Sequence, residues 1–276
     1  MGQDRQAMKR KVARPWHDRP DFSSPVRRAF ANVPPRRMII HQLIYSFLKA
    51  KGGSPEFFNL QARDAIGWMR RQGVKFASAT TVLDIGCGFG DVGGEVARTG
   101  AQVTLSDDDS FVSPDYQHLP FRKFNLDRDD FATLGQYDVV ICSNVLEHLP
   151  RPDRLLAAIP LLLKPGGRCY LSWTNWHSPW GGHEFSPFHY LGFHRGVRIW
   201  ERVTKRQRQH NPGENLYYTT IGRTLRTLRA NPALRIATMA PRYYPEFACL
   251  VHLPVVREFL TWNCAMLLAR SEDAPR

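Results

Sequence analysis

The sequence has no long apolar run and no secretory signal. Its longest nearly unbroken apolar stretch, residues 155–163, falls well short of the ~20 residues that a membrane-crossing helix needs. The N-terminus is charged and contains several prolines, without the apolar segment of a signal peptide. We therefore expect a cytoplasmic protein, and a peripheral contact with the inner face of the membrane stays open.

Cysteine is scarce and unclustered. The five cysteines form no C-x-x-C pair, and the clustered ligands of a structural zinc site are absent. Three of the five lie in predicted buried strands or in the loop after one, which is typical of reduced cysteines that fill a core. Neither disulfide bonds nor structural zinc are expected.

Negative charge is in short supply outside the middle of the chain. The 38 Lys and Arg outnumber the 25 Asp and Glu, which gives a net charge of +13. Residues 1–50 carry a net +8 and residues 195–229 a net +7, whereas residues 51–194 carry −3. This asymmetry indicates an anionic partner near the basic segments, whether nucleic acid, phospholipid headgroups or a phosphorylated acceptor.

The central motif of the chain runs from Thr81 to Gly90. An apolar run contains Asp84 near its end and is followed by glycines at alternate positions, beginning with Gly86 and Gly88. This pattern predicts a buried parallel strand and then a loop whose glycines turn tightly and let a ligand approach the backbone.

A second acid indicates a nucleotide site. The segment 102–106 predicts the next strand, and it ends at Asp107, 23 residues after Asp84. An acid at this distance binds the ribose hydroxyls in nucleotide-binding βαβ units. The spacing fits both NAD and S-adenosylmethionine.

Two further segments distinguish these cofactors. They are residues 137–149, YDVVICSNVLEHL, and residues 161–171, LLLKPGGRCYL. With the glycine loop, in this order and spacing, they resemble the class I S-adenosylmethionine-dependent methyltransferases, of a type 11-like kind, over residues 80–175. The resemblance implies S-adenosyl-L-methionine as cofactor. It also implies a Rossmann-like α/β fold, with a seven-stranded, mostly parallel sheet, an antiparallel last strand and helices on both faces.

The resemblance also divides the chain. Residues 80–175 would form the cofactor-binding core. Around it we expect a basic, flexible arm, cap helices, an acceptor-side insertion with basic helices, and the last two strands, at residues 1–35, 36–79, 176–230 and 231–276. Apolar periodicity predicts helices at residues 36–51, 60–71, 91–99, 195–208 and 220–229. A further helix from Pro152 is expected to break near Ile159, because Pro160 follows.

The cofactor-binding residues follow from matching this sequence to the family's motifs. Asp107 would bind the ribose, and Asp108 either adds a contact or lies in a solvated turn. Asn125 and Leu126 stand where the family holds the adenine, although Asp127 would serve after a two-residue shift. The expected set is Asp84, Gly86, Cys87, Gly88, Asp107, Asp108, Asn125, Leu126, Ser143 and Asn144.

Metal dependence is not expected. Some relatives that methylate phenols hold a divalent metal with acids after the fourth strand, but Asn144 and Val145 stand there in this chain. Histidines 177, 183, 189 and 194 have spacings that imitate a metal cluster, but without the helix context that would support one.

Residues 173–190 are expected to line the acceptor pocket, since they include three tryptophans, three histidines and an acid. The stretch SPWGGHE, residues 178–184, is similar to one in uncharacterised actinobacterial methyltransferases, some thought to act in envelope lipid or glycan pathways. His183 is either a structural residue or the general base, oriented by Glu184 or another acid, and His148 is the second candidate base.

We therefore expect methyl transfer from S-adenosylmethionine, most simply to an oxygen of a small-molecule, lipid or glycan acceptor. The reaction depends chiefly on alignment of donor and acceptor, and an alcohol also needs a base. The alternatives are an RNA methyltransferase that uses the basic segments and a non-catalytic cofactor-binding protein. Nucleic acid is the less favoured partner, because no appended RNA-binding fold is recognisable.

Overall fold

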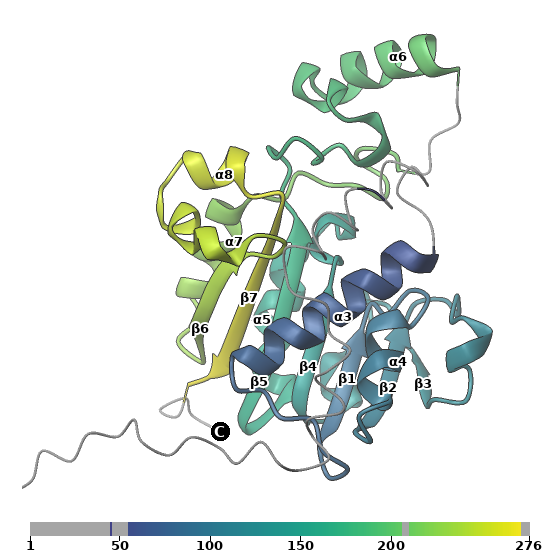
Figure 1. Ribbon diagram of the computed structural model, residues 1–276, viewed down its shortest axis with the longest axis vertical. Helices are drawn as coiled ribbons and strands as arrows, with labels where there is room; N and C mark the ends of the chain where they lie inside the picture. The colour runs from purple at the N-terminus through teal and green to yellow at the C-terminus, as the bar shows by residue number, and fades with distance from the viewer. Residues whose placement is uncertain (1–44, 46–54, 206–209, 272–276) are drawn as a thin grey trace, which may run out of the picture. The chain divides into compact units, whose positions relative to one another are not determined.

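The computed structural model describes residues 45, 55–205 and 210–271 of the chain (Figure 1). All of them belong to the unit Arg36–Arg276. The predicted arm, residues 1–35, and nearly all of the predicted helix 36–51 lie outside the described residues. Within the described part, no helix combines the length and the apolar character needed to cross a membrane.

A seven-stranded sheet forms the centre of the described unit (Figure 1), with its strands in the order β3-β2-β1-β4-β5-β7-β6. Strand β7 runs antiparallel to both of its neighbours, and the other paired strands are parallel. The predicted fold class is confirmed. The strands are β1 (Thr81–Ile85), β2 (Gln102–Asp107), β3 (Phe121–Lys123), β4 (Tyr137–Ser143), β5 (Leu163–Thr174), β6 (Leu234–Pro241) and β7 (Asn263–Arg270).

The helices of the described residues are α3 (Pro55–Arg71), α4 (Asp91–Ala97), α5 (Pro152–Leu162), α6 (Phe193–Thr204), α7 (Ile221–Arg229) and α8 (Val256–Leu260). Helices α3 and α4 cover one face of the sheet and α5 and α7 the other, whereas α6 lies beyond the end of the sheet (Figure 1). Short 3-10 helices connect them: η1 (Pro114–Tyr116), η2 (Phe131–Leu134), η3 (Leu146–His148), η4 (His183–Phe185), η5 (Phe188–Leu191) and η6 (Pro245–His252).

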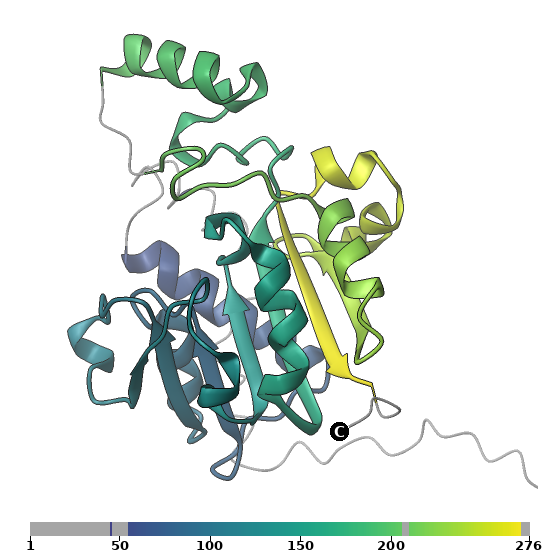
Figure 2. The same ribbon diagram turned by 180° about the vertical axis from the view of Figure 1, so that it is seen from behind.

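Alternating side chains of the central strands supply two cores. In β1, Val82 packs into the core beneath α3 and α4, whereas Leu83 and Ile85 pack into the core beneath α5 and α7. Successive side chains of a strand point to opposite faces, so one apolar run fills both layers. Figures 1 and 2 show the two helix pairs on opposite faces of the sheet.

Two glycines bring α4 against the sheet. A Cβ atom on Gly93 would lie 2.4 Å from Leu105 of β2 and 2.9 Å from Asp84 Oδ2, and one on Gly94 would lie 2.2 Å from the ring of Tyr116. Glycine weakens a helix relative to alanine, but here it lets α4 lie against β2 and η1.

Helix α5 departs from its prediction. It runs through Pro160 to Leu162, so the break expected near Ile159 is wrong. Proline removes one backbone donor, but this one lies in the last turn of α5 and is buried together with Ile159 and Leu162. Packing of the apolar face thus holds the helix together where its backbone bonding is weakened.

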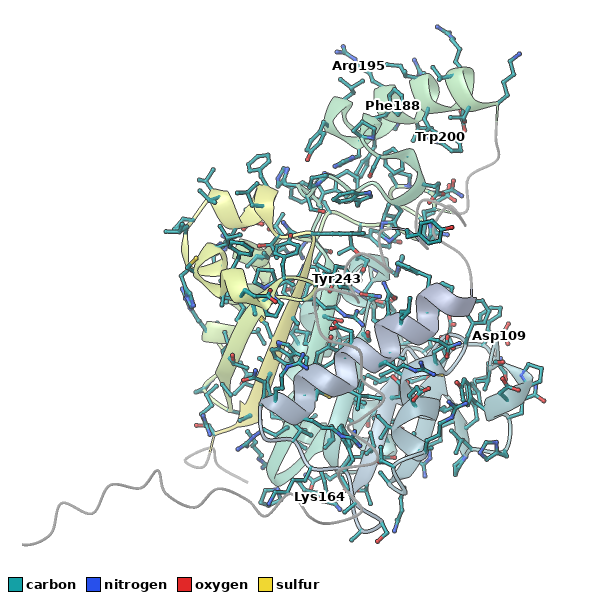
Figure 3. All side chains as sticks on the ribbon, viewed as in Figure 1. Asp109, Lys164, Phe188, Arg195, Trp200 and Tyr243 are labelled. Carbon is teal, nitrogen blue, oxygen red and sulfur yellow. The ribbon has the colours of Figure 1, made fainter. Side chains whose placement is uncertain are left out.

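The segment between β5 and β6 has a core of its own. Trp176, Phe185, Trp200 and Leu216 are buried together, with Phe188 packed against them. We call this group, with the backbone that carries it, the insertion core. Figure 3 shows Phe188 and Trp200 between η5 and α6, while Arg195 of α6 points outward.

Candidate functional site

The candidate cofactor site begins at the carboxyl end of β1. Asp84 is 2% exposed, and its Oδ2 accepts a hydrogen bond from the backbone N–H of Gly93 at 2.7 Å. The bond ties β1 to the first turn of α4 and so fixes both ends of the glycine loop. Burial raises the pKa of Asp84 to about 7, against the lowering effect of this hydrogen bond, and the nearby Asp107 and Asp91 raise it further.

The glycine loop itself turns back toward β2. The N–H groups of Gly86 and Cys87 donate to the carbonyl of Ser106 at 2.8 Å and 3.1 Å. Gly86 has a φ of 69°, and a Cβ there would lie 2.6 Å from Val145, the residue that precedes η3. Burial, and next the charge of Asp84, raises the pKa of the Cys87 thiol, which therefore stays neutral.

Asp107, at the end of β2, lies across this loop. Its Oδ2 accepts from the N–H of Gly88 and its Oδ1 from the N–H of Asp108, both at 2.8 Å. Burial raises the pKa of this half-buried carboxyl. Asp108 and Asp109 are exposed, and Figure 3 shows Asp109 on the loop beyond β2. The acids and glycines assigned to the cofactor are thus brought together, and their contacts with it stay predictions.

Asn125 and Leu126 shape a turn after β3. The Oδ1 of Asn125 accepts from the N–H of Asp127 at 3.0 Å, and its own N–H donates to Asp129 at 2.8 Å. The carbonyl of Leu126 accepts from Arg154. The role of this turn in holding the adenine stays a prediction.

Ser143 and Asn144, at the end of β4, meet a buried arginine that the sequence analysis missed. Arg242 follows β6 and has no exposed side-chain surface. Its Nη1 lies 3.3 Å from Ser143 Oγ and from Asn144 Oδ1, and its Nη2 donates to the carbonyl of Gln61 in α3 at 2.8 Å. Its Nε lies 3.8 Å from Asp64 of α3.

The arginine thus joins α3 to the carboxyl edge of the sheet. Burial alone would lower the pKa of Arg242, but Tyr170, Tyr243 and Asp64 raise it above its usual value, so the guanidinium is charged. Asn144 itself has a φ of 58°, a conformation that asparagine tolerates better than most residues. No sequence pattern separates this arginine from an exposed one.

Three histidines converge next to the end of β4. They are His148 of η3, His183 of η4 and His210, which lies after α6. Their ring centroids are 5.4 Å apart for His148 and His183, 5.3 Å for His148 and His210, and 4.5 Å for His183 and His210. We call these three residues the histidine cluster. The sequence analysis named His148 and His183, but it missed His210.

Backbone and carboxylate oxygens orient these rings. The Nδ1 of His148 lies 2.7 Å from the carbonyl oxygen of Asn215, and the Nδ1 of His183 lies 3.5 Å from that of Gly181. Glu184 or another acid was expected to orient His183; Glu184 instead accepts hydrogen bonds from His210, from Nδ1 at 2.6 Å and from the backbone N–H at 2.7 Å.

The cluster also sets the charges of its members. Burial lowers the pKa of His183 to about 3, with further lowering by His148 and His210, so this imidazole is neutral near pH 7. Burial alone would raise the pKa of Glu184, but the hydrogen bonds from His210 lower it to about 2. The histidine cluster therefore has an anionic carboxylate, that of Glu184, bound to its member His210.

His177 and His189, also named in the sequence analysis, have separate partners. His177 Nε2 lies 2.5 Å from the hydroxyl of Tyr218, and the 1% exposed His189 lies with Nε2 3.1 Å from the carbonyl of Ser178. The spacing that imitated a metal cluster thus does not bring these two to His183.

Comparison with known proteins accounts for the arrangement of loop, acids and sheet. A family model described as a methyltransferase domain matches residues 83–169. An uncharacterized methyltransferase of Mycolicibacterium paratuberculosis is 31% identical over 250 residues, which cover 82% of this chain and 92% of that protein. Another, from Mycolicibacterium gilvum, is 33% identical over 254 residues, which cover 82% of this chain and 92% of that protein. The chain belongs to this methyltransferase family.

The fold of this methyltransferase agrees with that assignment. A TehB-like SAM-dependent methyltransferase from Corynebacterium glutamicum superposes with a TM-score of 0.50 and 16% sequence identity, over 84% of this chain and 96% of that one. The class I fold predicted from the sequence is the fold observed.

In the methyltransferase, aromatic side chains from α3, from the SPWGGHE stretch and from the residues around β6 and β7 pack together. Trp180, from the SPWGGHE stretch, stacks on Trp262 with ring centroids 4.2 Å apart, and Tyr243 packs against Trp262. Phe58 of α3 lies 5.7 Å from Phe89 of the glycine loop. Segments before and after the core therefore meet at the same edge, where an organic acceptor would find apolar walls.

Proposed function

We propose that this methyltransferase transfers the methyl group of S-adenosyl-L-methionine to a hydroxyl oxygen of a small-molecule, lipid or glycan acceptor. The glycine loop and Asp107 are the expected site of the methyl donor. They lie at the carboxyl ends of β1 and β2, where ligands bind in open α/β sheets.

The reaction is an in-line displacement. A lone pair of the acceptor oxygen forms the new O–C bond while the C–S bond breaks, its electron pair stays on sulfur, and S-adenosylhomocysteine leaves. The hydroxyl proton passes to an imidazole and then to solvent. Alignment of oxygen, carbon and sulfur supplies most of the acceleration.

The histidine cluster, beside the end of β4, is the observation that supports a hydroxyl oxygen as the acceptor. A carbonyl can only accept a hydrogen bond, so His148 donates through Nδ1 to Asn215 and keeps Nε2 as a base. His183 stays neutral and suits a role in orienting the hydroxyl, and Glu184 acts through His210. This set provides a proton acceptor beside the expected methyl donor.

The basic insertion supports an anionic acceptor or an anionic lipid surface. Helix α6 exposes Arg195, Arg198 and Arg202, while its Trp200 is buried in the insertion core. A positive helix face of this kind attracts phosphate-bearing molecules to the acceptor side.

Calorimetric titration with S-adenosylhomocysteine tests the donor site. Replacement of Asp107 by Ala removes the carboxylate that faces the loop, and we expect at least a ~10-fold loss of affinity, as for a lost charge-assisted hydrogen bond. Asp109→Ala is the matched control, because that acid is exposed and accepts its hydrogen bond from the neighbouring Ser110 N–H. Equal affinities in both variants would refute the assigned site.

Transfer of labelled methyl groups to polar lipid and glycan fractions tests the acceptor. We expect label in a base-stable methyl ether that depends on the intact protein and decreases in His148→Ala. Label found on nitrogen would overturn the proposed oxygen acceptor and leave the donor site intact.

A further inference from the structure

The histidine cluster has the composition of a metal centre. His148, His183 and His210 come from three separate segments, and each offers one ring nitrogen within 4.8 Å of the nitrogens of the other two. Imidazole is among the commonest metal ligands in proteins, so three rings that converge in this way can hold one ion.

The hydrogen bonds of the cluster determine which ring nitrogens are left to bind an ion. Asn215 O and the carboxylate of Glu184 accept from Nδ1 of His148 and of His210. The nitrogen left on each of these rings is Nε2, which in this tautomer carries no hydrogen. The Nδ1 of His183 faces the carbonyl of Gly181 at 3.5 Å, so the same choice of tautomer suits the third ring.

We propose that His148, His183 and His210 bind one first-row divalent cation, and that zinc is the ion their chemistry fits best. Neutral imidazole suits zinc, copper, nickel and iron, whereas magnesium and calcium prefer oxygen ligands. Three protein ligands leave one position of a tetrahedral ion open, which is the pattern of catalytic rather than structural zinc sites.

The surroundings of the cluster match those of known metal sites. Metal-bound histidines commonly donate their second nitrogen to a carboxylate or a backbone carbonyl, which fixes the ring and strengthens it as a ligand. His210 has the carboxylate, Glu184 at 2.6 Å, and His148 has the carbonyl, Asn215 at 2.7 Å. The anionic Glu184 also offsets the charge of the cation.

The three histidine rings would have to move slightly closer together to bind the ion. Tetrahedral zinc with Zn–N distances of about 2.0–2.1 Å places its ligand nitrogens about 3.3 Å apart. The present upper limit of 4.8 Å therefore calls for ring movements of about 1 Å. His183, with a φ of 51°, lies in a conformation that only a few per cent of non-glycine residues adopt, and such positions concentrate at functional sites.

The chemical meaning of the site rests on the proposed function. A hydroxyl oxygen in the open position of the ion would lose its proton more easily than a free alcohol, since a bound divalent cation lowers the pKa of a coordinated oxygen. With the ion bound, Nε2 of His148 would be a ligand and not a base, so the ion would take over activation of the hydroxyl and the proton would pass to solvent.

Metal titration of the full-length, chelator-treated protein tests the site without donor or acceptor. We expect one equivalent of Zn²⁺ to bind in calorimetry, and one equivalent of Co²⁺ to give the visible absorption of a tetrahedral ion. His210→Ala should abolish both signals. His118→Ala, which removes an exposed histidine outside the cluster, should leave both unchanged.

A second variant protects the test against misfolding of His210→Ala. Glu184→Gln keeps all three imidazoles, and we expect a ~10–100-fold weaker affinity for Zn²⁺ with the same stoichiometry. Circular dichroism confirms the fold of each variant. Zinc binding of equal affinity in the wild type, His210→Ala and Glu184→Gln would overturn the proposal.

The outcome is separable from that of the proposed function. Zinc binding at the cluster with no binding of S-adenosylhomocysteine would support the metal site and refute the methyl donor site. Binding of S-adenosylhomocysteine with no cluster-dependent Zn²⁺ or Co²⁺ signal would overturn the metal site alone.

Discussion

Asp84 shows how a single side chain couples folding to pH. Its pKa rises from 3.8 to about 7 in the folded protein, mainly through burial. Between these values the folded chain holds a proton that the unfolded chain has lost, so the free energy of unfolding falls as the pH rises from about 4 to about 7. At higher pH the ionised carboxylate stays buried, and its cost is constant.

Asp84→Asn should remove this dependence, because the amide still accepts from Gly93 but carries no charge. We expect wild type and variant to have similar stability near pH 4. As the pH rises to 8, the free energy of unfolding of the variant should exceed that of the wild type by at most ~4 kcal/mol. Urea unfolding at several pH values measures the difference, and a constant offset across the range would contradict the shifted pKa. The exposed Asp109→Asn is the control.

Arg242, unlike Asp84, is buried with a partner of opposite charge, Asp64. Arg242→Met should destabilise the protein by ~3–5 kcal/mol, because the buried Asp64 loses its counter-ion and Ser143 and Asn144 lose a donor. Chemical denaturation gives the value. Arg235→Ala, at an exposed position of the preceding strand β6, should cost less than ~0.5 kcal/mol. Equal effects at both positions would refute a structural role for the buried guanidinium.

At the scale of the element, α3 and α4 offer a matched pair of glycines. Gly94→Ala in α4 should destabilise the protein despite the better helix propensity of alanine, because the new Cβ would lie 2.2 Å from the Tyr116 ring. Gly67→Ala in α3 meets only the end of Arg71, at 3.2 Å, and should stabilise by up to ~1 kcal/mol. Thermal unfolding distinguishes the two, and the same sign for both would contradict this packing.

Local pattern predicted most elements. The apolar runs that end at Ile85 and at Arg270 were recognised as strands, because a strand buried on both faces reads as a continuous apolar segment. The helix through Pro160 was not, because propensity rules omit the burial that holds α5 together. The geometry of the glycine loop was also predictable from local sequence, because its positive φ values favour glycine.

At the scale of the whole molecule, the sequence could not show what tertiary structure brings together. His210 lies 62 residues from His148 and follows a basic segment that drew attention for its charge alone. The link between them depends on Tyr217, whose N–H donates to the carbonyl of Glu147 at 2.7 Å and so returns the insertion to the sheet edge. Arg242 and Gln61 are farther apart still, and neither belongs to a motif.

The uneven charge of the chain leads to a prediction about surfaces. We expect the protein to bind vesicles that contain anionic phospholipid and to dissociate at high salt. Replacement of Arg195, Arg198 and Arg202 by Ala should weaken binding by up to ~100-fold, at about 1 kcal/mol per charge. The control removes three exposed charges elsewhere, at Lys75, Lys123 and Arg128. Equal loss in both variants, or binding to neutral vesicles, would contradict a lipid contact through α6.

The insertion core is separate from the two cores of the sheet, and this separation has a consequence for folding. Small cores with few anchors open as units, well below the energy of global unfolding. His183 and His210 both lie within the segment that carries this core, whereas His148 lies in η3 at the end of β4. An ion bound by all three histidines would stabilise the insertion against local unfolding. Amide hydrogen exchange in α6 would then slow as the occupancy of the site increases.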